Sequence, residues 1–401
     1  MRILVLTHNM QYPIEDGQSL RIYHYVRHLR RTHSFVLVTF GVPPHPEPIR
    51  DLFEQIWTVP RPGSQPEPLS LRKIARAISV DHAFYRDPAM EDLICRTIRE
   101  ERFDVVWASG WDMTAYTSRP LGLPVLADVV DEGFVEYSRE LLRSRRAKEA
   151  LLNLRHLFVN VRWERKYFRH ASACLVVSTV DARWLRRFVP GVPVHVVENG
   201  VDAEYFRPAG EPEEHPSIIF EGNMSFPPNV DAACYLAREI LPLVRQDFPN
   251  TRLYLVGRDP DPAVRALEGC AITVTGRVPD VRPYLARAAL FVCPMRRGAG
   301  IKNKLLQAWA MAKATVATPV ACGGLRIAPG ENILVARGAK AIACETVRLL
   351  SDEGLRRRMG AKARQIVLEH YSWEAKAAEL ERVLKSVAQS TPRVIPEEAF
   401  R

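Results

Sequence analysis

Short apolar runs alternate with amphipathic stretches along most of the chain. The first run, Ile3–Leu6, is followed by a polar loop from His8 to Gly17, and a helical pattern begins at Ser19. The next apolar run is Phe35–Phe40. Strands that are buried on both faces of a parallel sheet have this continuous apolar character. The pattern therefore predicts a βαβ unit whose first loop lies at the carboxyl end of the first strand, where such folds bind ligands.

The alternation continues to about residue 200. We expect further strands at Asp104–Ala108, Val125–Val130, Ala173–Ser178 and Val194–Val197. A single long helix is expected over roughly residues 139–170. The proline-rich region Gly41–Ser70 predicts an irregular surface connection rather than a module.

The composition changes at Tyr205–Pro216, which is rich in proline, glycine and acidic residues and predicts a domain linker. A second βα series follows it. Its expected strands are Ser217–Glu221, Thr251–Val256, Ile272–Thr275, Leu290–Cys293 and Thr315–Thr318, and its expected helices are Val230–Val244, Val281–Ala288, Lys302–Ala312 and Tyr371–Val387. Two such series predict an α/β fold of two Rossmann-like domains that face each other across a cleft. We expect the domains at residues 1–205 and 206–370, with a C-terminal helix at 371–390.

Composition and charge narrow the class of protein. The 401 residues are 47% hydrophobic and 25% charged, as in globular proteins, and the net charge of +10 favours phosphate-bearing ligands. The seven cysteines are odd in number and lie beside apolar residues, which indicates buried, reduced thiols. The apolar run at the N-terminus is too short for a signal peptide, and no stretch has the length of a membrane span. We therefore expect a cytoplasmic protein, soluble or peripheral on the inner face of the membrane.

The segment 294–318 carries the strongest chemical signal. After the strand ending at Cys293, a loop contains Arg296, Gly298 and Gly300, and a helix opens at 301–303 with Lys302 and Lys304. Glycines allow a close backbone approach, and a helix N-terminus with nearby cations favours an anion. A diphosphate fits this pattern better than the alternative, an ordinary βα turn with solvated lysines. The loop lacks the third glycine of a dinucleotide motif and is not a Walker P-loop.

Three other loops are expected at carboxyl ends of strands. Gly222 and Asn223 follow the first strand of the second domain, and Asn229 or Asp231 is a candidate cap of the next helix. Asp16, Gly17 and Arg21 lie in the first loop of the chain and form a candidate phosphate or acceptor loop. Asp128 and Asp131 end a buried strand; they are candidates for a general base, or alternatively aspartates that only cap the loop.

Five segments of the chain resemble the family 4 glycosyltransferases of the GT-B fold. They are the opening residues 1–29, VVENGVDAEYFRP (196–208), FEGNMSFPPNVDA (220–232), residues 274–318 and the closing HYSWE (370–374). The similarity runs over nearly the whole length of the chain. Within the family, the chain resembles the sugar transferases of bacterial exopolysaccharide clusters. The resemblance implies sugar transfer from a nucleotide-diphosphate donor with retention at the anomeric carbon and without an obligatory metal or other cofactor. It places the donor on the second domain and the acceptor, a glycan or a lipid-linked sugar, on the first. It also implies that the C-terminal helix at 371–390 crosses back to the first domain.

The resemblance also assigns roles to residues. Lys304 matches the lysine that contacts the donor diphosphate, and Arg296 matches an arginine of the same loop. Gly222 and Asn223 match the phosphate contacts of the first turn, and Gly17 matches the glycine-rich loop of the first domain. The remaining expected donor residues are Gly300, Ile301, Lys302, Asn303 and Gln307. Asp131, Asp128 and Lys304 are the expected catalytic residues.

The chain departs from the family pattern at three places. The glutamates of the family's E-x7-E motif are replaced by Ala299 and Gln307, and the usual arginine after Gly222 is Asn223. Asp131 or Asp128 stands near the place of the family's histidine. These changes keep open the alternative of a catalytically weak relative that binds a nucleotide sugar in a polysaccharide assembly. A nucleotide-sugar epimerase on the same scaffold, which would need no acceptor, is the other alternative.

The positive charge raises the question of two further partners. Nucleic-acid binding is not expected, because the chain has no interleaved aromatic pattern. An anionic membrane surface is a candidate partner of basic helices such as Arg21–Arg31. The arginine-rich region Arg139–Arg169 is interpreted as a solvated helix face.

Overall fold

A computed structural model describes residues 1–14, 16–41, 47–61, 87–118, 121–130, 133–144, 146–208, 210, 212–298 and 300–392. The described chain divides into two compact units. Unit 1 comprises Met1–Glu198 and the residues from Lys376 onward, and unit 2 comprises Asn199–Ala375. The division follows Glu198, whereas the sequence pattern predicts it at 205/206.

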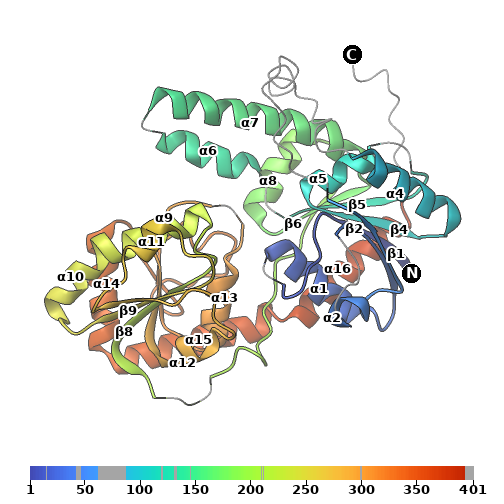
Figure 1. Cartoon of the computed structure of the whole chain (residues 1–401). Coiled ribbons are helices and arrows are strands. Elements are labelled where there is room, and N and C mark those ends of the chain that lie inside the picture. Colours follow the sequence, from blue (N-terminus) through green and yellow to red (C-terminus); the bar gives the residue numbers. More distant parts are fainter. Residues whose placement is uncertain are drawn as a thin grey trace. The chain divides into compact units, whose positions relative to one another are not determined.

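Unit 1 contains a parallel sheet with the strand order β3-β2-β1-β4-β5-β6-β7 (Figure 1). The strands are β1 (Arg2–Thr7), β2 (Ser34–Phe40), β3 (Gln55–Val59), β4 (Val105–Ser109), β5 (Val125–Val130), β6 (Ala173–Val176) and β7 (Val194–Val196). The helices are α1 (Gly17–Leu29), α2 (Glu47–Arg50), α4 (Pro88–Glu100), α5 (Trp111–Thr114), α6 (Gly133–Arg143), α7 (Ala147–Tyr167), α8 (Thr179–Phe188) and α16 (Trp373–Ala388), with short 3₁₀ turns at Ala115–Thr117 and Phe168–His170.

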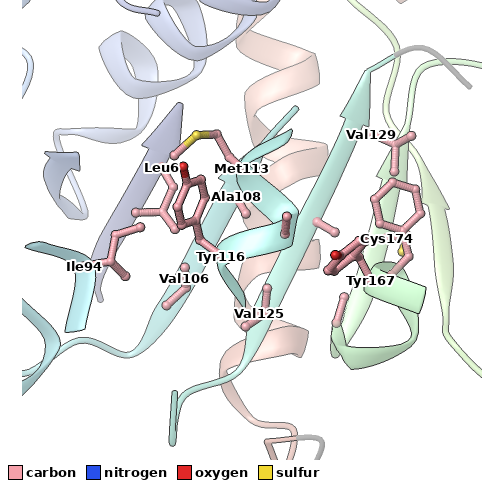
Figure 2. Close-up of a cluster of buried hydrophobic side chains, with 14 of the residues drawn as sticks. Leu6, Ile94, Val106, Ala108, Met113, Tyr116, Val125, Val129, Tyr167 and Cys174 are labelled. Atoms are coloured by element: carbon pink, nitrogen blue, oxygen red, sulfur yellow. The ribbon is translucent and has the colours of Figure 1, made fainter. Parts of the chain in front are cut away.

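The core of unit 1 forms because the strands are apolar on both faces. Leu6 of β1, Val106 and Ala108 of β4 and Val125 of β5 belong to one buried cluster. Figure 2 shows these side chains together with Tyr167, from the end of α7. Helices therefore have to cover both faces of the sheet, as expected for a doubly wound fold.

Unit 2 contains a second parallel sheet, with the order β10-β9-β8-β11-β12-β13. Its strands are β8 (Glu214–Glu221), β9 (Arg252–Val256), β10 (Ile272–Val274), β11 (Ala288–Cys293), β12 (Thr315–Ala317) and β13 (Leu334–Val335). Its helices are α9 (Pro227–Tyr235), α10 (Leu241–Asp247), α11 (Pro262–Arg265), α12 (Arg282–Arg287), α13 (Asn303–Ala310), α14 (Ala339–Ser351) and α15 (Glu353–His370), and a π-helical turn, Leu236–Ile240, joins α9 to α10. The prediction of two parallel-sheet α/β domains is confirmed.

Three details of the predicted fold are wrong. The region 41–70 is not irregular throughout, because β3 pairs in parallel with β2 as an edge strand. The long helix expected at 139–170 is two helices, α6 and α7. At the turn between them, the hydroxyl of Ser144 donates to the carbonyl of Glu140 and accepts from the side-chain amide of Asn153. Finally, Cys270 and Cys344 are exposed, so burial does not apply to every cysteine.

The chain passes between the units twice, after Glu198 and after Ala375. In each unit, a contact joins the two segments that connect it to the other unit. In unit 1, Lys376 Nζ lies 2.7 Å from Glu198 Oε2. In unit 2, the amide of Val201 donates to the carbonyl of Tyr371 at 2.8 Å. No helix in the described part of the chain is long and apolar enough to span a membrane.

Candidate functional site

In unit 2, β8 and β11 are parallel neighbours at the centre of the sheet. The strand order runs outward in opposite directions from this pair, so the loops after β8 and β11 diverge and leave room at the carboxyl edge. The loop after β8 contains Gly222 and Asn223. The loop after β11 contains Arg296 to Lys302 and leads into α13. The two strongest sequence signals of the second domain therefore belong to neighbouring loops.

Lys304, in the first turn of α13, connects these loops. Its Nζ donates to Asn229 Oδ1 of α9 at 2.7 Å and lies 4.5 Å from the centroid of the Phe220 ring. Gly222 has a φ of +151°, and a Cβ built there would lie 2.6 Å from Lys304 Nζ. A side chain at position 222 would therefore displace the ammonium group, which explains the need for glycine.

The charge of Lys304 is only partly balanced. Burial lowers the pKa of its ammonium group, while the nearby Glu221 raises it. Burial also raises the pKa of the Glu221 carboxyl, and Lys304 opposes this effect. The hydrogen-bond partner of Lys304 is an amide, which carries no charge. An anionic ligand would restore the stability of the ammonium form, because an opposite charge nearby favours the charged state.

Arg296 is held by α9. Its guanidinium forms a two-point ion pair with Asp231, with distances of 3.0 Å and 2.6 Å, and lies 4.1 Å from the centroid of the Tyr235 ring. The hydrogen bond to Asp231 raises the pKa of Arg296. Its side chain is 43% exposed. A guanidinium has five N–H donors, so further donors are available for a ligand.

The loop before α13 has the backbone that its glycines require. Gly298 and Gly300 have φ values of +102° and +64°. Lys302 is buried and its Nζ donates to the carbonyl of Gly300 at 3.0 Å, so this lysine fixes the loop itself. Ile301 is buried as well. Gln307 lies one turn after Lys304 on α13 and is half-buried.

Two expected caps have other roles. Neither Asn229 nor Asp231 caps α9, whose N-cap residue is Phe226 with no side-chain cap bond. Both instead contact the basic loop, at Lys304 and Arg296 respectively. The side chain of Asn223 accepts hydrogen bonds from the amide and hydroxyl of Ser225, at 3.0 Å and 2.8 Å, and so stabilises its own turn.

Other residues of the site could not be anticipated from motifs. Asn199 Nδ2 donates to Asn303 Oδ1 at 3.0 Å, which ties the segment entering unit 2 to the first residue of α13. A Cβ on Gly257, after β9, would lie 1.7 Å from the carbonyl oxygen of Gly222. The sequence marks these residues only by their positions: Gly257 directly follows a buried strand, and Asn303 begins a helix.

In unit 1, the structure argues against two expected site residues. Arg21 and Asp128 have no exposed side-chain surface, and they form an ion pair of 3.0 Å. Trp107 Nε1 donates to the same carboxylate oxygen at 3.3 Å. Groups that are sealed in this way stabilise the core and do not contact a ligand in this structure. The expectations of a phosphate contact for Arg21 and of catalysis for Asp128 are corrected accordingly.

Asp16 and Gly17, two other expected residues of unit 1, follow the loop after β1. Asp16 is the N-cap of α1, where its carboxylate accepts from the amide of Ser19 at 2.7 Å, and Gly17 is the first residue of that helix. Gln18 Nε2 donates to the carbonyl of Ser109 at 2.8 Å, beside Gly110, which has a φ of +92°. Asp131 and Ala299 lie outside the described residues. Among the described residues, no three His, Cys, Asp or Glu side chains are grouped as metal ligands.

Comparisons with known proteins agree with this architecture. A model described as "Glycosyl transferase 4-like domain" matches residues 16–200, and one described as "Glycosyl transferases group 1" matches residues 215–352. A phosphatidyl-myo-inositol mannosyltransferase of Mycobacterium leprae is 26% identical over 231 residues, which cover 55% of this chain and 60% of that protein. An alpha-maltose-1-phosphate synthase of Mycobacterium tuberculosis is 28% identical over 239 residues, 51% of this chain and 60% of that protein. The matched part thus spans 60% of the length of these relatives.

Solved structures share the fold at low identity. Sucrose-phosphate synthase from Thermosynechococcus elongatus has a TM-score of 0.73 at 16% identity, over 96% of this chain and 98% of that one. Anabaena HepE in complex with UDP-glucose has a TM-score of 0.67 at 14% identity, over 96% and 100% of the two chains. The two matched family models and this fold together show that the chain belongs to the family 4 glycosyltransferases of the GT-B fold.

Proposed function

We propose that this glycosyltransferase moves a sugar from a nucleotide-diphosphate donor to a glycan or lipid-linked acceptor in polysaccharide biosynthesis. We further propose retention at the anomeric carbon and independence of metal. The observation that carries the proposal is the contact of Lys304 with the loop of Gly222 through Asn229, at 2.7 Å. In this contact, the ammonium group of Lys304, whose charge is only partly balanced, lies beside Gly222, where no side chain blocks the approach of a ligand.

In the proposed reaction, the bond between the anomeric carbon and the donor's phosphate oxygen breaks, and a bond from the acceptor oxygen to the same carbon forms. The acceptor proton leaves with the diphosphate or with a base of unit 1, for which Asp131 is our candidate. Negative charge develops on the departing diphosphate. Lys304, the remaining N–H groups of Arg296 and the amides at the start of α13 stabilise that charge because they are fixed before the reaction begins.

Two relatives support the choice of substrates. The HepE structure holds UDP-glucose, so UDP-glucose is the first donor to test. The mycobacterial mannosyltransferase is named for phosphatidyl-myo-inositol, which supports a lipid-anchored acceptor.

The test is thermal stabilisation by a panel of nucleotide-diphosphate sugars, starting with UDP-glucose. A ligand at 100 times its dissociation constant stabilises a protein by about 2.7 kcal/mol. We expect a shift for the native chain and for Lys362→Met, an exposed lysine outside the site, and no shift for Lys304→Met. A shift that persists in Lys304→Met would refute the assignment.

Turnover assays then separate the remaining alternatives. Transfer that persists in EDTA and yields product of the donor's anomeric configuration, measured by NMR, supports the proposal. Conversion of the donor sugar without an acceptor would instead indicate an epimerase. Binding without turnover, also in Gln307→Glu, would indicate a catalytically weak relative.

A further inference from the structure

The helices α6 and α7 form an antiparallel hairpin in unit 1, shown in green in Figure 1. One face of α7 packs inward. The rings of His156 and Tyr137 of α6 lie 5.2 Å apart, and Trp163 lies 5.2 Å from Trp111. These contacts fix which side of α7 is turned toward the protein.

The opposite side of α7 exposes large apolar residues. Leu151, Leu154 and Phe158 are 69%, 51% and 60% exposed, and Leu142, near the tip of the hairpin, is 88% exposed. Positions 151, 154 and 158 are spaced by three and four residues, so their side chains form one stripe. A contiguous apolar stripe of this kind on a surface marks an interaction site more often than isolated residues do.

The stripe is bordered by positive charge. Lys148, Arg155 and Arg162 are exposed and fall on the same side of the helix at 3.6 residues per turn. The guanidinium carbon of Arg162 lies 5.8 Å from the centroid of the Phe158 ring. The acidic residues of α7, Glu149 and Glu164, fall on the opposite side. This face therefore combines apolar side chains with cations and carries no acid of its own helix.

We propose that this face of α7 docks on an anionic lipid bilayer. Leucine and phenylalanine side chains insert at the level of the headgroups, and Lys148, Arg155 and Arg162 bind the lipid phosphates. The charge of the face matches such a surface, and its apolar stripe distinguishes a bilayer from a nucleic acid, which requires only the cations. The helix expected to bind the membrane, Arg21–Arg31, lacks such a face, because Arg21 is sealed in the core and Ile22, Val26 and Leu29 are buried.

The docking proposal goes beyond the proposed function and does not depend on it. Docking would bring unit 1 to the surface in which a lipid-linked acceptor resides. Vesicle binding is measured without any donor, so its failure is distinct from a failure of sugar transfer.

The experiment is co-sedimentation of the full chain with vesicles of phosphatidylglycerol and phosphatidylcholine, or of phosphatidylcholine alone. We expect binding to the anionic vesicles only, decreasing as salt is added. The double variants Leu154→Ser/Phe158→Ser and Arg155→Ser/Arg162→Ser should each bind at least about 10-fold more weakly. The control Leu368→Ser, at a half-exposed leucine of α15 in unit 2, should bind like the native chain.

Two results would overturn the proposal. The first is no binding to anionic vesicles, or equal binding by the native chain and both double variants. The second is a change of oligomeric state in the Leu154→Ser/Phe158→Ser variant without loss of vesicle binding, because the face would then join two copies. Circular dichroism melting curves check the folding of all variants, which we expect to be unchanged because the substituted side chains are exposed.

Discussion

The two units each place a cation on a helix that borders a parallel sheet, and they use it in opposite ways. In unit 1, Arg21 faces the carboxylate of Asp128 and is sealed from solvent. In unit 2, Lys304 faces the amide of Asn229 and remains half-buried. The carboxylate of Asp128 makes Arg21 part of the core, whereas the amide of Asn229 does not neutralise the charge of Lys304.

Unit 2 also has a buried cation, Lys313, with a carboxylate partner, but at the other end of its sheet. Lys313 Nζ lies 2.9 Å from Glu213 Oε1 and 2.8 Å from the carbonyls of Ala286 and Ala288. Glu213 directly precedes β8, and Ala288 begins β11. Unit 2 therefore places the Lys313 ion pair at the amino ends of the strands and the basic loop of Lys304 at the carboxyl ends.

The largest expected effect is on the stability of unit 1. Asp128→Ala leaves the guanidinium of Arg21 buried without its carboxylate, which should lower the free energy of unfolding by about 3–5 kcal/mol. Urea denaturation measures it. Glu345→Ala, which removes the exposed partner of Arg348 in unit 2, should change stability by less than about 1 kcal/mol. Equal stability of Asp128→Ala and the native chain would remove the contrast between the units.

The matching change in unit 2 should affect catalysis instead. Lys304→Met should reduce kcat by about 100-fold or more, as removal of a fixed charge-stabilising donor does. Its stability should stay unchanged or rise, because burial disfavours the ammonium form. Lys313→Met provides the contrast, since it should lose stability by removing the buried donor of the carbonyls of Ala286 and Ala288. Destabilisation of Lys304→Met to the level of Lys313→Met would show that Lys304 is a structural residue as well.

The predictability of the fold from the sequence reflects how the strands are buried. β5, whose predicted bounds are correct, lies inside the sheet and is apolar except for the buried Asp128. β3 escapes prediction because it is an edge strand in which Gln55 and Trp57 are exposed, so the apolar pattern is broken. The break between α6 and α7 escapes prediction because neither glycine nor proline marks it.

The sequence predicts the residues of the candidate site within each loop, but not the contacts between loops. Glycines and cations near Lys304 indicate a diphosphate. Asn229 and Asp231, however, contact Lys304 and Arg296 across 75 and 65 positions of the chain. Local spacing contains no information on such pairs, and the same limitation hides the pairing of Arg21 with Asp128.

A fall in pH should have a smaller effect, a loss of stability that is confined mainly to unit 1. Burial lowers the pKa of four described histidines, His33, His156, His170 and His195, and all four belong to unit 1. For His170 the pKa falls from 6.5 to about 4. The unfolded chain therefore binds a proton that the folded chain rejects, so stability is full above pH 6.5 and is lost as the pH falls toward 4. For His170 alone the loss is at most roughly 3 kcal/mol.

Denaturation at pH 7 and pH 5 tests this expectation. The native chain should lose stability at pH 5, and His170→Gln should lose less. Hydrogen exchange followed by mass spectrometry should show that unit 1 opens before unit 2 in acid. Equal pH dependence of the native chain and His170→Gln would contradict the assignment to this histidine.

The smallest expected effect concerns the start of α13. Asn199→Ala removes the hydrogen bond to Asn303, which is worth about 1 kcal/mol, and should weaken donor binding about fivefold by loosening the first turn. Calorimetric titration of the donor measures the change. Asn303→Ala should have the same effect, and the double variant should add nothing further. Additive effects would show that the two amides act independently.

The chain leaves unit 1 after Glu198 and returns to it at Lys376, and these two residues form an ion pair. Unit 2 is an insertion within unit 1, and its two ends meet in a hydrogen bond between Val201 and Tyr371. Joining these ends would close a very short loop, which has a small entropic cost. Unit 2 is therefore suited to excision as a separate domain or to exchange between related enzymes, with the cuts made beside Asn199 and Ala375.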